Sequence, residues 1–90
     1  MHKTEIGWTR RDDLGERLDV YTRRIGHEWQ FFFRRRRYEQ WQRILEPCLD
    51  DWLKLLDGVK RRVGRQLLRP EEIRRVEALI RQNHPEAEFK

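Results

Sequence analysis

The residues with the clearest chemical potential lie in one stretch, Trp29–Trp41, where aromatic side chains run directly into four consecutive arginines. Three phenylalanines precede the arginines, and a tyrosine and a tryptophan follow them. Flat aromatic rings stack on unpaired bases, and guanidinium groups bind phosphate oxygens in pairs. Side chains of these types at this spacing predict a surface that binds RNA or single-stranded DNA.

Alternation along a strand predicts which of these side chains act together. Phe32, Arg34 and Arg36 are expected on one side of a strand, with Tyr21 of a neighbouring strand beside Phe32. The candidate nucleic-acid-binding residues are Tyr21, Arg23, Arg24, Phe32, Arg34, Arg35, Arg36 and Arg37. The stretch does not match the RNP1 pattern of an RRM, so the prediction depends on charge, flat rings and proximity alone.

The balance of charge supports a basic surface in the first half of the chain. The 90 residues hold 21 Lys+Arg against 16 Asp+Glu, a formal charge of +5. Residues 1–45 carry eleven bases and seven acids, whereas residues 46–90 carry ten and nine. Arginine outnumbers lysine seventeen to four, which suits bidentate phosphate binding, although GC-rich coding produces the same bias.

Catalytic and cofactor-binding motifs do not accompany this surface. The sequence contains no serine, and its one cysteine, Cys48, has no histidine near it in the sequence. His2, His27 and His84 lack the spacing of zinc ligands, and the five glycines form no phosphate-binding loop. We therefore expect a protein that is not an enzyme and has no metal or other cofactor. One cysteine, no apolar leader and no stretch of about 18 apolar residues predict a cytoplasmic protein without a transmembrane segment.

Turn signals in the first half predict short antiparallel strands. Ile6 and Trp8 begin a strand, residues 12–15 form a turn, and Gly26 with His27 suits a two-residue hairpin loop of type II′. Such a loop fixes the register, with Arg24 facing Trp29, Thr22 facing Phe31, Val20 facing Phe33 and Leu18 facing Arg35. One face then carries Leu18, Val20, Trp29, Phe31 and Phe33. The other pairs Tyr21 with Phe32 and Asp19 with Arg34.

A helical interpretation of residues 14–33 competes with this hairpin. Apolar residues recur there at spacings of three and four, at Leu14, Leu18, Tyr21, Ile25, Trp29 and Phe32. That helix would contain two glycines, and the Val20-Tyr21-Thr22 run and the phenylalanines prefer strands. The sheet is favoured, and an all-α three-helix bundle is the alternative.

The second half has a helical period and predicts two helices, at residues 48–67 and 70–83. In the first helix the expected buried residues are Leu49, Trp52, Leu53, Leu56, Val59, Val63 and Leu67. In the second, which begins at Pro70, they are Ile73, Val76 and Ile80, with Leu79 at the edge. The predicted fold is α+β, with a small antiparallel sheet from residues 5–36, a three-stranded meander or a hairpin, packed by this two-helix hairpin. Residues 1–90 form one domain, frayed at 1–4 and 86–90.

The prediction for function is a non-enzymatic binding module, and two alternatives stay open. In the first, the basic face meets another ligand: an acidic protein, anionic lipid headgroups, or a second copy of the chain. In the second, Tyr21, Phe32, Tyr38 and Trp41 are buried, and the arginines are a solvated rim paired with nearby acids. Exposure of these rings distinguishes the alternatives.

Overall fold

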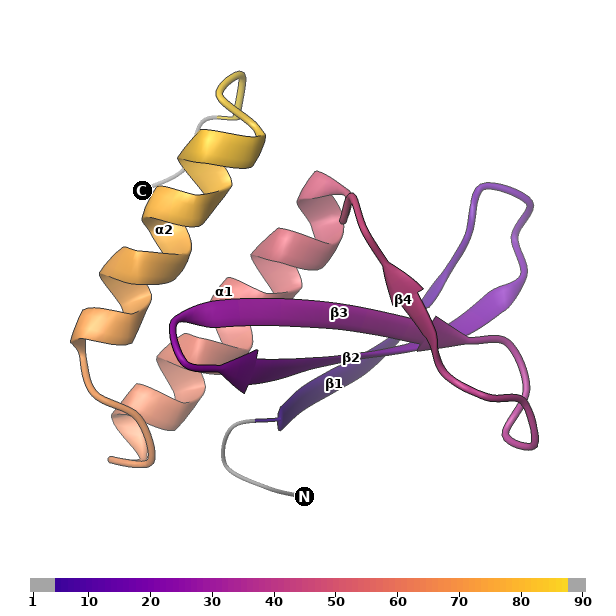
Figure 1. Cartoon of the computed structure of the whole chain (residues 1–90), viewed down its shortest axis with the longest axis horizontal. Coiled ribbons are helices and arrows are strands. Elements are labelled where there is room, and N and C mark those ends of the chain that lie inside the picture. Colours follow the sequence, from indigo (N-terminus) through magenta and orange to yellow (C-terminus); the bar gives the residue numbers. More distant parts are fainter. Residues whose placement is uncertain (1–4, 88–90) are drawn as a thin grey trace. The chain divides into compact units, whose positions relative to one another are not determined.

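The computed structural model describes residues 5–87 and shows a four-stranded antiparallel sheet followed by two helices (Figure 1). The elements are β1 (Glu5–Arg11), β2 (Arg17–Ile25), β3 (Glu28–Arg34), β4 (Gln42–Ile44), α1 (Leu49–Gly64) and α2 (Glu71–Asn83). The predicted α+β class is confirmed, and the all-α alternative is wrong. The chain divides into two compact units, Met1–Glu46 with the sheet and Pro47–Lys90 with both helices.

Strand pairing in the sheet follows the order β1-β2-β3-β4, so each strand lies beside the next in sequence. The predicted β2–β3 register is confirmed for Arg24 with Trp29, Thr22 with Phe31, and Val20 with Phe33. Figure 1 shows these two strands as the long central pair of the sheet. A turn of two residues therefore determines which side chains share each face over the whole hairpin.

The β2–β3 turn has the backbone that its sequence predicts. Gly26 has φ of 62°, a conformation that side-chain-bearing residues rarely adopt, and His27 does not share it. Positive φ at the first turn residue alone is the signature of type II′. The predicted pairing of Leu18 with Arg35 is wrong, because β3 ends one residue earlier, at the pair of Arg34 with Asp19.

One side of the sheet, which we call the buried face, carries the core of this unit. Its buried side chains are Ile6, Leu18, Val20, Thr22, Trp29 and Phe31. Thr22 is the polar member, and its Oγ1 donates a hydrogen bond of 2.9 Å to the Ile6 carbonyl. The Trp8 ring meets Phe31 edge-on at 6.4 Å between centroids. Alternate residues of β1, β2 and β3 thus supply one apolar surface.

The sheet has a fourth strand that the sequence analysis did not predict. β4 pairs with β3 through Ile44 with Phe31, Arg43 with Phe32 and Gln42 with Phe33. Three residues are too few to show a period of two, so this strand has no pattern of its own in the sequence. Its pairing brings the end of the aromatic and arginine-rich stretch back against β3.

Helix α1 is shorter than predicted and buries a somewhat different stripe. Trp52, Leu56 and Val59 are buried as expected, and so are the unpredicted Leu55 and the first-turn Asp51. The predictions for Leu53 and Leu67 are wrong, with 37% and 44% of each exposed. The helix ends at Gly64, which leaves Leu67 in the connection, and Leu53 lies beyond the edge of the stripe that Trp52, Leu55, Leu56 and Val59 define.

Helix α2 buries Val76 and Ile80 as predicted, whereas Ile73 and Leu79 are half-buried. His84 follows it, and its Nε2 lies 3.0 Å from the carbonyl oxygen of Pro47, just before α1. Ala87 N donates to the His84 carbonyl at 3.0 Å, closing a turn. The predicted frayed ends, 1–4 and 86–90, lie outside the described residues except for residues 86 and 87. Within residues 5–87, no helix has the length and apolar character needed to cross a membrane.

Candidate nucleic-acid interface

The side of the sheet opposite the buried face carries most of the candidate residues, and we call it the aromatic face. Strand pairing aligns one row of residues across all four strands: Gly7, Tyr21, Phe32 and Arg43. The neighbouring row toward the end of β3 holds Thr9, Asp19 and Arg34. Two rows therefore place aromatic and cationic side chains side by side, as the register predicted.

Three rings of the aromatic face form a cluster, Tyr21, Phe32 and Trp41. Tyr21 and Phe32 are stacked, with centroids 5.0 Å apart and planes inclined by 17°. Trp41 meets Tyr21 edge-on at 4.6 Å and 75°. Tyr21 and Phe32 are half-buried, whereas Trp41 is 37% exposed. The cluster thus combines fixed ring positions with aromatic surface that reaches solvent.

Arg34 joins this cluster as a cation held on an aromatic ring. Its guanidinium carbon lies 4.3 Å from the centroid of Trp41, inside the range of a cation–π interaction. Its Nε lies 3.7 Å from a carboxylate oxygen of Asp19, and its Nη1 donates to the Arg37 carbonyl at 3.2 Å. These contacts fix Arg34 at the border between the aromatic cluster and the following loop.

Beside Tyr21, β1 contributes a glycine to the aromatic face. Gly7 pairs directly with Tyr21, so β1 places no side chain next to the ring in that row. A glycine inside a strand often marks a close approach of another molecule or backbone. Arg23 and Arg43 are exposed on the same face, and Arg43 Nη2 donates a hydrogen bond of 3.3 Å to the Glu28 carboxylate in an ion pair. The rings therefore have cations beside them and no β1 side chain in the row of Tyr21.

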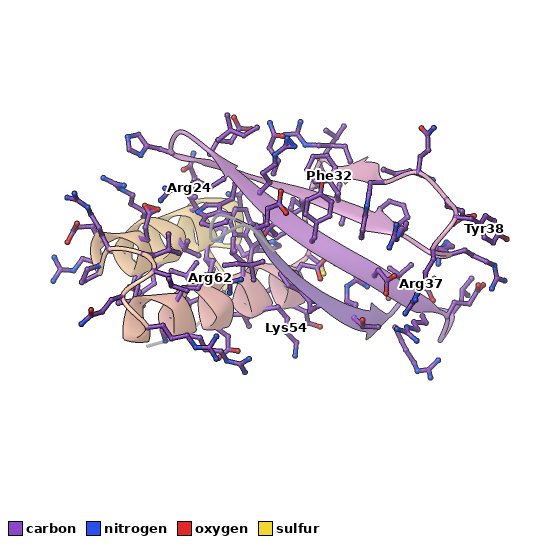
Figure 2. The ribbon with its side chains drawn as sticks, turned by 90° about the horizontal axis from the view of Figure 1, so that it is seen from below. Arg24, Phe32, Arg37, Tyr38, Lys54 and Arg62 are labelled. Atoms are coloured by element: carbon purple, nitrogen blue, oxygen red, sulfur yellow. The ribbon has the colours of Figure 1, made fainter. Side chains whose placement is uncertain are left out.

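The loop after β3 is folded, although it is rich in arginine. Glu39 Oε1 accepts hydrogen bonds from the backbone N–H groups of Arg35 and Arg36, at 3.2 and 3.1 Å. Glu39 N donates to the Arg36 carbonyl at 3.0 Å. Figure 2 shows Arg37 and Tyr38 in this loop at the end of the strands, and Phe32 over the strands themselves.

Asp12 joins this loop to the turn between β1 and β2. Its Oδ1 accepts hydrogen bonds of 2.9 Å from the N–H group of Leu14, inside the predicted turn of residues 12–15, and from that of Glu16, just after it. Its Oδ2 accepts a bond of 2.5 Å from Arg35 Nη1. The Arg35 guanidinium, and then the Glu16 N–H, hold the pKa of the Asp12 carboxyl below its ordinary value of 3.8.

This carboxylate predicts a pH-dependent contribution to stability. Because the pKa of Asp12 is lower in the folded state, its stabilisation is complete above about pH 3.8 and is lost as the pH falls through the folded value. We expect Asp12→Asn to lower the melting temperature at neutral pH, and the difference from the unmodified protein to disappear in acid. Thermal melts of both proteins across this range test it, with the exposed Asp13→Asn as control. A difference that persists below the folded pKa would contradict the role of the charge.

The structure brings some of the predicted residues together and separates others. Tyr21, Arg23, Phe32 and Arg34 share the aromatic face. Arg24 pairs with Trp29, on the other side of the sheet. Arg35, Arg36 and Arg37 lie in the loop beyond β3. The prediction that Arg36 continues the strand alternation of Phe32 and Arg34 is therefore wrong. The alternative with buried rings is wrong for Tyr38 and Trp41, which are 83% and 37% exposed.

Some residues of the interface were absent from the predicted site. The pairing of β4 brings in Arg43 and, just before it, Trp41, and the register of β1 brings in Gly7. Arg17 is the first residue of β2 and lies opposite Arg11. Counting back from the predicted turn at residues 12–15 would place Gly7 opposite Val20. The loop has one residue more, so Arg11 pairs with Arg17 and Gly7 lies opposite Tyr21. Trp41 and Arg43 had no turn signal of this kind.

Other candidate groups and the comparisons add no second site. Cys48 is exposed at the N-cap of α1. Among residues 5–87, no group of three or more His, Cys, Asp or Glu side chains is arranged to hold a metal ion. Comparison with models of protein families, with curated proteins and with solved structures finds no match to this chain.

Proposed function

We propose that the aromatic face binds single-stranded nucleic acid, RNA or DNA, as a non-enzymatic module. The observation that carries this proposal is the aromatic cluster of Tyr21, Phe32 and Trp41 with Arg34 on the Trp41 ring. Rings fixed beside cations are what stacking of unpaired bases and pairing of their phosphates require. A single cysteine in 90 residues suits a reducing compartment, and we propose the cytoplasm.

In this mode, bases stack on the solvent-reaching surfaces of the cluster while phosphates run along its arginine border. A base would enter the row of Tyr21 from the β1 side, where the pairing residue is Gly7. Each stacked base contributes about 1 to 3 kcal/mol to the free energy of binding, and an aromatic ring can stack on any of the four bases. Affinity is therefore expected to depend weakly on sequence and strongly on whether the strand is single.

Salt dependence tests the electrostatic half of this proposal. The logarithm of the association constant for a labelled single strand is expected to fall with the logarithm of salt concentration by about 0.7 per phosphate contact. The double variant Arg23→Ala, Arg43→Ala removes two cations from the aromatic face, and should flatten the slope by about 1.4. Fluorescence anisotropy at several salt concentrations measures it.

The matched control is Arg65→Ala with Arg74→Ala, which removes the same charge from two exposed positions of the helical unit. This variant should keep the slope of the unmodified protein. If both double variants flattened the salt dependence by the same amount, net charge, and not the aromatic face, would attract the strand. Binding of double-stranded DNA as tightly as the single strand would equally contradict stacking.

A protein partner, acidic or a second copy of this chain, is the second candidate. Large apolar side chains are exposed around the loops of the sheet unit: Leu14 at 84%, Tyr38 at 83% and Leu45 at 80%. Of these side chains, tyrosine, with the nearby arginines, is of a type enriched at protein interfaces, and the two leucines add apolar area. Such binding would survive moderate salt, whereas strand binding would weaken, so the same titrations distinguish the two candidates.

A further inference from the structure

A polar pocket of about 330 Å³ lies in the sheet unit, between the turn after β1 and the loop after β3. It is lined by Glu16, Arg17, Asp19, Arg35, Arg36 and Arg37. Four arginines against two carboxylates leave an excess of two positive charges. The volume is at the small end of the range of about 300 to 1,000 Å³ for ligand sites, enough for a small anionic group.

The loop that carries three of the pocket's arginines is held in position before any ligand binds. Arg35 is fixed by its bond to Asp12 and lies 5.9 Å from the centroid of the Phe33 ring. Glu39 pins the backbone at Arg35 and Arg36. The side chains of Arg36 and Arg37 are exposed and form no ion pair with any residue of 5–87. Their charge is thus available to an anion at little cost in ordering the loop.

The carboxylates of the pocket do not cancel this excess. The Asp19 carboxylate forms ion pairs with Arg17 Nη2 at 3.8 Å and Arg34 Nε at 3.7 Å, and it accepts a hydrogen bond from Thr9 Oγ1 at 3.4 Å. Its charge is therefore already balanced by two guanidinium groups. Glu16 forms no ion pair within residues 5–87, and its carboxylate favours a hydroxyl or amino donor next to the anion over a second phosphate.

We propose that this pocket binds the terminal phosphate monoester of a single-stranded nucleic acid, an inference that rests on the function proposed above. A monoester carries about 1.5 to 2 negative charges at neutral pH, which matches the excess, whereas an internal phosphodiester carries about one. Asp19 lines the pocket and lies two residues from Tyr21 on the same face of β2. A strand anchored by its end in the pocket would therefore lead its next bases onto the aromatic cluster.

The test compares oligonucleotides of one sequence with a 5′-phosphate, a 3′-phosphate, or hydroxyls at both ends. The protein is expected to bind one phosphorylated form about tenfold or more tightly than the hydroxyl form. In Arg36→Ala with Arg37→Ala the phosphorylated and hydroxyl forms should bind with equal affinity, so the ratio of the two dissociation constants falls to about one. The control Arg65→Ala with Arg74→Ala should keep the preference.

The outcomes separate this inference from the function on which it rests. Equal affinity for all three oligonucleotides would overturn the terminal-phosphate site and leave binding by the aromatic face intact. Absence of binding by all three would contradict the proposed function itself, and the inference with it. A preference that survives in the Arg36, Arg37 variant would place the phosphate outside this pocket and overturn the inference.

Discussion

Phe31→Ala is expected to lower the free energy of unfolding by about 3 to 5 kcal/mol, among the largest effects of a single change in the sheet. Phe31 is 1% exposed and lies on the buried face, where its ring contacts Trp8 and its backbone pairs with both neighbouring strands. Removing the ring leaves a cavity on this face. The total free energy of unfolding of a small domain is only about 5 to 15 kcal/mol, so this loss is a large share of its stability.

The adjacent phenylalanine is the matched control for this stability measurement. Phe32 lies on the aromatic face, half-buried, and stacks on Tyr21. Phe32→Ala removes a ring of the same size but is expected to cost only about 1 to 2 kcal/mol. Urea denaturation followed by tryptophan fluorescence measures both variants. A loss for Phe32→Ala as large as that for Phe31→Ala would mean that the two faces are not distinct.

Phe32→Ala is expected to weaken binding of single-stranded nucleic acid by about 5- to 100-fold, provided that the variant remains folded. The estimate follows from about 1 to 3 kcal/mol for each base stacked on an aromatic ring. The ring also supports Tyr21 from the side, so its removal disturbs the stacking surface as a whole. Anisotropy titrations at constant salt measure the change.

Two conservative variants separate stacking from packing at this position. Phe32→Tyr keeps a flat ring and should bind nearly as well as the unmodified protein. Phe32→Leu keeps apolar bulk without a flat ring and should lose most of the affinity that Phe32→Ala loses. Full affinity in Phe32→Leu would contradict base stacking and favour a general apolar contact.

The β2–β3 hairpin is the part of the fold that residue patterns specified most completely. Gly26 with His27 selected the turn type, and the turn type fixed the register through Tyr21 with Phe32 and Asp19 with Arg34. The aromatic pair and the ion pair follow from this local information alone. Half of the candidate site could thus be predicted because its geometry depends on a two-residue loop.

The rest of the site depends on contacts between segments distant in sequence. Trp41 reaches Tyr21 because the loop after β3 reverses the chain and β4 pairs for only three residues. Arg35 meets Asp12 across 23 positions, which brings the two loops of the pocket together. Neither contact follows from periodicity or turn chemistry, so the arginine run was predicted to continue a strand although it forms a loop.

In the helical unit, the sequence predicted the helices themselves but not the exact set of buried residues. A period of 3.6 residues identified both helices. On α1, however, the predicted buried stripe included Leu53, which is exposed, in place of Leu55, which is buried. Leucines occupy residues 53, 55 and 56, so apolar character alone does not define the centre of the stripe.

The most direct test of the central claim is a titration of isotopically labelled protein with an unlabelled single-stranded oligonucleotide, followed by backbone amide NMR. We predict concerted, saturable shifts at Tyr21, Arg23, Phe32 and Arg34, and little change in residues 47–90. Shifts confined to the helical unit, or no shifts at low salt with any single strand, would contradict binding by the aromatic face.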